Sequence, residues 1–409
     1  MRNRLSVWYA APGHSLVTTS GTTRNILSLA EALSNWADVT VAFRRVFEPV
    51  QSERYKVIAI EHQTRESTDI KDGEAMRGLD PLSHLSYLRT LRSFSQKGAG
   101  SCDVVLEKGW HLSGYLLDAF RRRGIPGVLI ENEVGFWNEP LHDLRTIAKY
   151  ALHSTAQCVA GTCSRHAPVV IAETQELKTM LVEHRRVPKE RIEVVELGVD
   201  HTLFRPMDQA SARSSLGISP DATVLLYVGG MDKYHDLGPV IEALSQTESP
   251  FVQLHLVGDG EHRTRYKVKA RAASNNVTFH GRVAHDKVPE YVAAADLCIA
   301  PYCADAFPNR MVPFSTLKIP EYMASGRPVV SIPSGHIQSL IKDQISGFLF
   351  PNDVFSWGSF LKAIPPRKRL EEMGRAAAQA VERRSWENTA ARYLEVCQKL
   401  AKGNSKLCA

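Results

Sequence analysis

Short apolar runs alternate with amphipathic helical patterns along almost the whole chain, and this alternation limits the folds open to it. Such alternation is typical of βαβ units, whose strands are parallel and buried on both faces. The helix expected at residues 22–34 is clear, because Ile26, Leu29 and Leu33 share one face. The expected strands are 5–10, 38–43, 56–60, 103–108, 127–131, either 158–162 or 169–173, 192–196, 223–230, 252–258, 277–281, 297–302, 328–332 and 347–350.

The pattern predicts an α/β protein with two doubly wound, Rossmann-like domains that face an interdomain cleft. A chain of 409 residues is too long for one compact core. The strand series restarts after an extended segment that begins at Leu197 and contains Pro206. We therefore expect one domain at residues 1–200, a second at 201–380, and an amphipathic helix at 381–409 that packs back across the domains.

Composition and charge argue against several classes of protein. Hydrophobic residues make up 44% of the chain, yet no apolar run approaches the roughly 20 residues of a transmembrane helix. The first apolar run is short, so we expect a strand there and no signal peptide. The seven cysteines include no CxxC pair. We therefore expect reduced thiols, with neither a metal centre nor a disulfide.

The net charge of +6 favours anionic partners, either sugar nucleotides or an anionic membrane surface. The basic residues lie in short clusters, and solvated helix ends would explain most of them. No basic stripe interleaved with aromatic residues is present, which argues against nucleic acid. We expect a cytoplasmic protein, and a peripheral contact with the inner membrane face stays open.

The stretch FSTLKIPEYMASGRPVV, residues 314–330, carries the most chemical information. Ser315 and Thr316 are common N-cap residues, and Pro320 is tolerated only in a first helical turn. A short helix should therefore begin near Thr316 or Leu317. Its first amides would be unpaired, and such a helix start attracts phosphate.

Two charged residues lie within the first turn of this expected helix. Lys318 adds a positive charge, and Glu321 adds an acceptor for sugar hydroxyls. A phosphate cradle and a hydroxyl acceptor so close together indicate a nucleoside diphosphate ligand. A capped surface helix with an ordinary lysine and glutamate explains the same residues equally well.

Three strand ends in the second half carry glycine or charge. The strand TVLLYV runs into Gly229 and Gly230, which allow close approach to a phosphate, and Lys233 and His235 follow. The segment VGDG forms the second end, and Arg282 lies at the tip of the third. None of these is a Walker A loop or a GxGxxG motif. We expect the three ends and the 314–330 stretch to converge at one edge of one sheet.

The sequence resembles the retaining glycosyltransferases of family four, which adopt the GT-B fold. The resemblance covers nearly the whole chain and is strongest from Tyr227 to Phe350. The likeness rests on the YVG turn, the LVGDG strand end, the V-x-F-x-G-R-V segment, the pair Ala295–Asp296, the E-x-M-A-x-G-x-P-V-V block and SGFLF, in matching order and spacing. The resemblance implies transfer of a hexosyl group from a nucleoside diphosphate sugar, with retention and without a metal or other cofactor.

The resemblance also implies roles for single residues in the donor site. Glu321 would hold the ribose hydroxyls, and the backbone around Arg282 and Val283 would meet the base. The amides of Ser315, Thr316 and Leu317 would bind the diphosphate.

In the expected donor site, the sequence departs from the family at three positions. Pro313 stands where a first glutamate is usual, and Gly230 and His235 stand where cations are usual. The chain resembles a variant branch with a Ser-x-Leu-Lys run before the donor-site glutamate. In that branch Lys318 and His235 would replace the missing phosphate cations.

The first domain should supply the acceptor site and the catalytic polar groups. Family members often carry a histidine after the strand GVLIE, but this chain has Glu131, Asn132 and Glu133 there. These three are candidate contacts with donor sugar or acceptor, and a strand-end cap is the other interpretation. His111 is a further catalytic candidate, although lone histidines are more often structural. Gly21 would approach the diphosphate from across the cleft.

These observations predict a glycosyltransferase that uses a nucleoside diphosphate sugar, with UDP favoured over GDP, and an acceptor hydroxyl or other nucleophile. No motif identifies the acceptor, which would be a small molecule, a glycan or a lipid-linked species. A sugar-nucleotide epimerase or a phosphorylase of the same fold is an alternative. A non-catalytic sugar-nucleotide binder is another, because several motif cations are absent.

Overall fold

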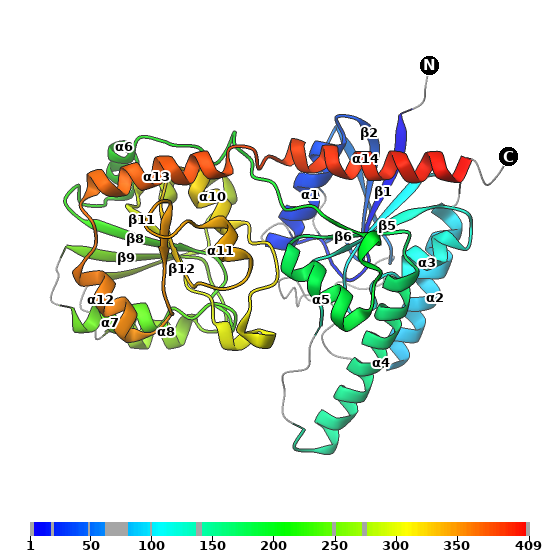
Figure 1. The fold of residues 1–409 in the computed structure, drawn as a ribbon, viewed down its shortest axis with the longest axis horizontal. Helices are drawn as coiled ribbons and strands as arrows, with labels where there is room; N and C mark the ends of the chain where they lie inside the picture. The colour runs from blue at the N-terminus through cyan, green and yellow to red at the C-terminus, as the bar shows by residue number, and fades with distance from the viewer. Residues whose placement is uncertain are drawn as a thin grey trace. The chain divides into compact units, whose positions relative to one another are not determined.

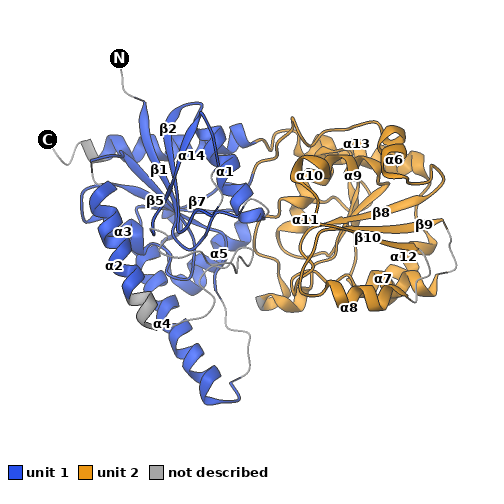
Figure 2. Ribbon diagram, turned by 180° about the vertical axis from the view of Figure 1, so that it is seen from behind, with its two compact units in different colours: residues 1–197, 386–409 blue, residues 198–385 orange. Residues whose placement is uncertain are grey.

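The computed structural model describes residues 4–17, 20–47, 50–61, 81–98, 100–135, 141–247, 251–271 and 276–405. The chain divides into two compact units (Figure 2). Unit 1 comprises residues 1–197 together with 386–409, and unit 2 comprises residues 198–385.

Unit 1 is a seven-stranded parallel sheet with helices on its faces (Figure 1). The strand order is β3-β2-β1-β4-β5-β6-β7. Its strands are β1 (Leu5–Ala11), β2 (Ala37–Phe43), β3 (Tyr55–Ala59), β4 (Val104–Lys108), β5 (Gly127–Glu131), β6 (Val169–Ala172) and β7 (Ile192–Val194). Its helices are α1 (Gly21–Leu33), α2 (Pro81–Gly98), α3 (Tyr115–Arg121), α4 (Leu144–His166), α5 (Gln175–Arg185) and α14 (Trp386–Ser405).

Unit 2 is a six-stranded parallel sheet in the order β10-β9-β8-β11-β12-β13. Its strands are β8 (Thr223–Val228), β9 (Val252–Val257), β10 (Val277–Gly281), β11 (Leu297–Ala300), β12 (Val329–Ser331) and β13 (Gly347–Leu349). Its helices are α6 (Gln209–Leu216), α7 (Gly238–Gln246), α8 (Arg263–Ala270), α9 (Val288–Ala294), α10 (Lys318–Ala324), α11 (His336–Leu340), α12 (Val354–Lys362) and α13 (Arg367–Val381).

Every strand expected from the sequence is present, and the prediction of two doubly wound α/β sheets is confirmed. Of the two alternatives for the sixth strand, residues 169–172 form β6, whereas residues 158–162 lie inside α4. The capping box at Asp143 starts this helix, because its carboxylate accepts from the Thr146 amide at 2.7 Å.

The amphipathic helix at the end of the chain is α14, which packs against α1 within unit 1. Its buried side chains include Ala390, Tyr393 and Cys397, at the three- and four-residue spacing of a helix face. The last segment of the chain therefore returns to the first sheet and completes its core.

Both faces of the β8 strand are buried, which explains its unbroken apolar sequence. Val224 and Leu226 belong to one hydrophobic cluster, and Leu225 and Tyr227 belong to the cluster on the opposite face. Alternate residues of a strand point to opposite faces, so helices must cover both. Each such side chain contributes about 1.5–3 kcal/mol when it is buried.

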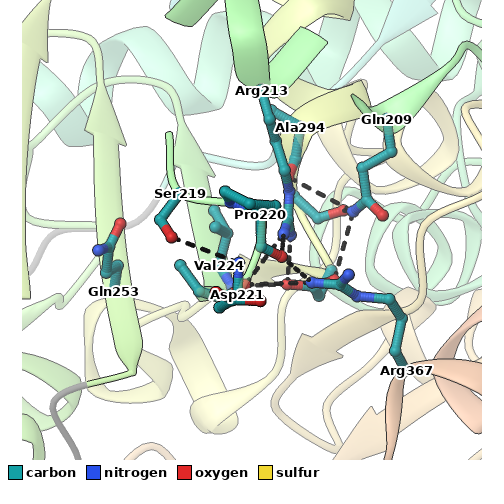
Figure 3. A network of polar contacts seen from close by, with 12 residues as sticks. Gln209, Arg213, Ser219, Pro220, Asp221, Val224, Gln253, Ala294 and Arg367 are labelled. Atoms are coloured by element: carbon teal, nitrogen blue, oxygen red, sulfur yellow. Dashed lines mark hydrogen bonds and ion pairs between the residues drawn. The ribbon is translucent and has the colours of Figure 1, made fainter. Parts of the chain in front are cut away.

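A buried carboxylate at Asp296, just before β11, ties the sheet of unit 2 to its helices. Figure 3 shows its partners Arg213, Val224 and Arg367 together in this polar network. The Asp296 carboxylate accepts hydrogen bonds from Arg213 Nη2 at 2.7 Å and from the Val224 amide at 2.7 Å. Arg367 Nε and Gln209 Nε2 approach the other oxygen at 3.2 and 3.3 Å. The Ala295–Asp296 pair is therefore a structural element that joins α6, β8 and α13.

Within the described ranges, no helix is long and apolar enough to cross a membrane. The same ranges contain no group of three or more His, Cys, Asp or Glu side chains arranged to hold a metal ion.

Candidate donor site

Three glycines bring the ends of β8, β9 and β10 into direct contact. The Gly258 amide donates to the Gly281 carbonyl at 2.7 Å, and the Gly229 amide donates to the Val257 carbonyl at 3.0 Å. The backbone at Gly258 has φ +128°, and a Cβ there would lie 2.0 Å from the Gly229 carbonyl oxygen. Only glycine fits such an approach. The expected convergence of these strand ends is confirmed.

The short helix α10 starts beside this edge, at Lys318. Its first backbone bond runs from the Glu321 amide to the Leu317 carbonyl at 3.1 Å. The earlier amides of the turn have no partner within the helix, which leaves donors at its start. The helix start expected near Leu317 is confirmed.

The capping expected from Ser315 and Thr316 is wrong. Leu317 has helical backbone angles and occupies the N-cap without a side-chain bond. The Thr316 hydroxyl instead accepts from the Tyr302 hydroxyl at 2.7 Å, and both residues are buried. The buried Ser315 Oγ has no hydrogen-bond partner among the described residues.

The Lys318 amine lies at the centre of the candidate donor site. Its Nζ is 2.8 Å from His235 Nε2 and 3.3 Å from the Tyr227 hydroxyl. It also lies 4.6 Å from the centroid of the Tyr227 ring and 5.6 Å from that of Tyr302. A Cβ added to Gly229 would lie 2.8 Å from this Nζ. The amine therefore reaches the glycine turn after β8.

Burial lowers the pKa of Lys318 to about 7, although the carboxylates of Asp232 and Glu321 partly offset the effect. Removing an ammonium group from water disfavours its charged form. A lysine near its titration point at neutral pH is typical of functional positions.

His235 is neutral at pH 7. Burial and then the charge of Lys318 lower its pKa to about 4, against a smaller opposing effect of Asp232. Although His235 Nδ1 lies 2.9 Å from Asp232 Oδ1, this contact is a hydrogen bond that the neutral ring donates to the carboxylate, rather than an ion pair. The expectation that His235 supplies a missing positive charge is therefore corrected.

The other residues expected in the donor site lie around this edge with different exposure. Gly230 and Arg282 are exposed, and Val283 is half-buried against the core of unit 2. Lys233 is exposed, with its amine 5.2 Å from the Tyr234 ring centroid, and is not among the groups that contact Lys318. Glu321 is half-buried, one turn into α10.

Glu131, expected as a catalytic candidate, is enclosed within unit 1. Its side chain is 1% exposed and pairs with Arg185 Nη1. Ser164 Oγ donates to the same carboxylate oxygen at 3.2 Å, and Ser113 Oγ donates to the other at 3.2 Å. Burial raises the pKa of Glu131, and the Arg185 charge opposes this shift. With both oxygens occupied, Glu131 has the contacts of a structural residue.

The remaining candidates in unit 1 are more accessible. Glu133 is exposed, and Asn132 is half-buried with an Oδ1 atom that has no hydrogen-bond partner among the described residues. His111 is half-buried beside the Trp110 ring, 4.8 Å between centroids. Gly21 is the exposed first residue of α1, and a Cβ there would meet nothing within 4 Å.

The sequence interpretation missed Asp232. Its spacing of three residues from His235 was the available signal, because both follow the same strand and turn. The carboxylate fixes the hydrogen-bonding state of the imidazole, which in turn contacts Lys318.

Comparison with known proteins places the chain in a family. Residues 19–203 match the model described as Glycosyltransferase Family 4, and residues 222–364 match the model described as Glycosyl transferases group 1. The chain belongs to glycosyltransferase family 4, a retaining family. It is a glycosyltransferase with a GT-B fold that uses a nucleotide-sugar donor.

Among its relatives is a D-inositol 3-phosphate glycosyltransferase of Nocardioides sp., 30% identical over 345 residues, or 75% of this chain and 69% of that protein. The protein of the same name from Segniliparus rotundus is 30% identical over 237 residues, and the chain spans about half of its length, 50%.

Solved structures share the fold. Sucrose-phosphate synthase from Thermosynechococcus elongatus has a TM-score of 0.76 at 19% identity, covering 98% of this chain and 100% of that one. Anabaena HepE in complex with UDP and glucose has a TM-score of 0.69 at 18% identity, covering 97% and 100%.

Proposed function

We propose that the protein transfers a hexosyl group from a nucleoside diphosphate sugar, with UDP favoured, to an acceptor hydroxyl, without a metal. The observation that carries this proposal is the Lys318 amine beside the glycine turn after β8 and at the start of α10. Backbone amides at a helix start and one adjacent ammonium are suited to a diphosphate.

In this proposal the donor lies along the carboxyl edge of the unit 2 sheet. The diphosphate binds Lys318 and the first-turn amides of α10, and Glu321 accepts from the ribose hydroxyls. The base lies against the backbone near Arg282 and Val283. Ligands of doubly wound sheets bind at this edge, which supports the assignment.

The proposed chemistry is electrostatic. The bond between the anomeric carbon and the diphosphate oxygen breaks, and its electron pair leaves with the diphosphate. Lys318 and the amides stabilise the charge that develops there. The acceptor oxygen bonds to the anomeric carbon on the same face, and its proton passes to the departing diphosphate oxygen. Asn132, Glu133 and His111 of unit 1 are the candidates for contacts with acceptor or sugar.

The acceptor is the open part of the proposal. The name shared by the relatives makes D-inositol 3-phosphate the first acceptor to test. Other hydroxyl acceptors, including glycans and lipid-linked sugars, follow in the same assay.

A peripheral membrane contact is proposed for the beginning of α4, which projects from the rest of unit 1 (Figure 1). Leu144 is 86% exposed and Ile147 is 48% exposed, with Arg145 and Lys149 beside them on the helix. Apolar and basic groups together favour an anionic lipid surface. Sedimentation with anionic vesicles, but not neutral ones, is expected, and the double variant Leu144→Ser, Ile147→Ser should lose it.

The donor proposal is tested by mutating its two charged residues. Lys318→Ala and Glu321→Ala should each lower kcat/KM by about 100-fold or more, because each loses contacts to the donor. Exposed residues of the same unit serve as controls, and Lys362→Ala and Glu382→Ala should keep wild-type turnover.

A thermal-shift panel of nucleoside diphosphates and sugar nucleotides identifies the donor, since a bound ligand stabilises the folded state. Turnover is then measured with and without a chelator. Wild-type turnover in both Lys318→Ala and Glu321→Ala would refute the site. Donor hydrolysis or phosphorolysis without transfer to any acceptor would favour the other GT-B enzymes, and binding without turnover would favour a non-catalytic binder.

A further inference from the structure

Three side chains from two segments of unit 2 form one hydrogen-bonded chain. Asp232 and His235 lie in the loop after β8, and Lys318 begins α10. Asp232 Oδ1 is 2.9 Å from His235 Nδ1, and His235 Nε2 is 2.8 Å from Lys318 Nζ. The imidazole also packs against the rings of Tyr227 and Tyr302, with centroids 5.8 and 4.8 Å away.

The chemistry of the two end groups fixes the state of the imidazole between them. A carboxylate only accepts hydrogen bonds, and an ammonium only donates them. His235 must therefore carry its proton on Nδ1, donate it to Asp232, and accept from Lys318 at Nε2. A second proton on Nε2 would face an ammonium at 2.8 Å. The chain therefore requires a neutral ring, whereas Lys318 can donate to Nε2 either as an ammonium or as a neutral amine.

We propose that Asp232 and His235 are positioning residues that hold the Lys318 amine at the donor site, and that donor binding takes up a proton onto Lys318. This inference rests on the proposed donor site. In the ligand-free protein the imidazole and the Tyr227 hydroxyl occupy two of the three donor positions of the ammonium. The third N–H is directed by these two bonds, and the diphosphate is the ligand that it meets.

The groups that face Lys318 explain why donor binding is coupled to protonation of its amine. Tyr227 from β8 and Tyr302 after β11 contribute neutral hydroxyl-bearing rings, and burial raises the pKa of both. The carboxylates of Asp232 and Glu321 favour the ammonium, but burial outweighs them and leaves the Lys318 pKa at about 7. A diphosphate adds negative charge next to the amine and raises this pKa.

Donor affinity should fall as the pH rises above the pKa of Lys318 in the free protein. Below the free pKa of Lys318, the amine is already protonated and affinity is at its full value. Above it, binding must recruit a proton from solvent, so affinity falls as the pH rises. The dissociation constant should increase by up to about 10-fold per pH unit until the pKa of the bound state is reached.

The first test needs no ligand. Nitrogen NMR of labelled histidine should show His235 as the Nδ1–H form throughout pH 6–8, as assigned with His235→Gln. Carbon NMR of labelled lysine should give Lys318 a midpoint near pH 7, assigned with Lys318→Met. Asp232→Asn should lower that midpoint, because the amide keeps an acceptor but loses the negative charge. An imidazole protonated on both nitrogens near neutral pH would overturn the chain.

The second test measures affinity by calorimetry at pH 6.5 and 8.5, with UDP-glucose and GDP-mannose as probes. Their diphosphates are esterified at both ends and lack the phosphate ionisation near pH 6, so the protein supplies the pH dependence. Above pH 7, buffers of different ionisation enthalpy should reveal proton uptake. Asp232→Asn should weaken binding more at pH 8.5 than at pH 6.5. Asp221→Asn, an exposed change in the same unit, should match wild type at both.

Two variants of His235 separate position from charge. His235→Gln places an acceptor near the former Nε2 and should keep donor affinity within about 3-fold of wild type. The shorter side chain of His235→Asn can bond to Asp232 but not to Lys318, so it should weaken donor binding by about 10-fold. Thermal unfolding shows whether each variant is folded. If a histidine variant does not fold, the affinity of Asp232→Asn and the NMR titration of Lys318 test the proposal instead.

The outcomes distinguish this inference from the proposed function. If neither probe binds the wild type at any pH, the donor-site proposal fails and this inference fails with it. If a probe binds with the same affinity at pH 6.5 and 8.5, or if Asp232→Asn equals wild type at both, the donor site stands and the proton-linked chain is refuted.

Discussion

Buried charge is handled differently at the strand ends of the two sheets. In unit 1, Glu131 at the end of β5 has both oxygens bonded, by Arg185 and two serine hydroxyls. A second buried ion pair lies there, between Lys108 Nζ and Glu173 Oε1 at 2.6 Å, and both side chains are at most 3% exposed. In unit 2, Lys318 meets an imidazole and two phenol rings rather than a carboxylate.

The difference separates two uses of a buried charge. A closed pair has no remaining capacity for a ligand, and its effect is on folding, because removal of one partner leaves the other unpaired. The Lys318 amine has a neutral imidazole and a phenol hydroxyl as its acceptors, so one N–H can still donate to a ligand. Its pKa is about 7. The sequence predicts both Glu131 and Lys318 as residues of the active site, but only Lys318 has contacts that suit ligand binding.

Breaking the closed pair should give the largest effect on stability. Arg185→Met leaves the Glu131 carboxylate buried without its cation, and should lower the free energy of unfolding by about 3–5 kcal/mol. Urea unfolding followed by circular dichroism measures this loss. The double variant Glu131→Leu, Arg185→Met removes both charges and should recover at least half of it.

The same variants test whether Glu131 has a catalytic role. With a structural role, the folded fraction of the double variant should turn over its donor with kcat within about 3-fold of wild type. A kcat reduced by about 100-fold at unchanged stability would instead assign Glu131 to the reaction.

At the open site, a smaller change should act on ligand binding. Gly229→Ala places a Cβ 2.8 Å from Lys318 Nζ and 3.2 Å from the Tyr227 hydroxyl, at a backbone φ of +149°. We expect a displaced amine and donor affinity about 10-fold weaker or more, with roughly 1–3 kcal/mol of strain. Calorimetric titration with the donor measures the first effect, and thermal unfolding measures the second.

Gly217→Ala is the matched control for backbone strain. Gly217 ends α6 with φ +65°, and a Cβ there would meet nothing within 4 Å. It should lose stability without losing donor affinity. Equal loss of affinity in both variants would mean that strain in unit 2, and not the position of Lys318, controls binding.

The fold could be predicted from the sequence because its signal is local. Each strand is a short apolar run bounded by polar or glycine residues, and each helix repeats its apolar face. The one ambiguous segment, residues 158–162, is apolar enough for a strand but continues the 23-residue helix α4. Short apolar runs do not distinguish the two states, and the capping box at Asp143 was the missed signal.

The charge state of the candidate site could not be predicted in the same way, because it depends on contacts between distant segments. Thr316 looks like a helix cap, but Tyr302, fourteen residues earlier, takes its hydroxyl. His235 looks like a substitute cation, but burial and a lysine 83 positions away keep it neutral. Residue type and spacing indicate which groups meet, and burial determines which of them carry charge.

The smallest expected effect separates the ring of Tyr302 from its hydroxyl. Tyr302→Phe removes the bond to Thr316 and keeps an aromatic ring over Lys318, so the free energy of unfolding should fall by about 0.5–1.5 kcal/mol. Donor affinity should stay within about 3-fold, because the amine keeps His235 and both rings. Tyr302→Leu removes the ring as well and should weaken binding further. If Tyr302→Phe alone weakened donor binding as much as Tyr302→Leu, the hydrogen bond between Tyr302 and Thr316 would be part of the donor site. The difference between Lys318 and the fully bonded Glu131 would then depend on this hydroxyl pair as well as on His235.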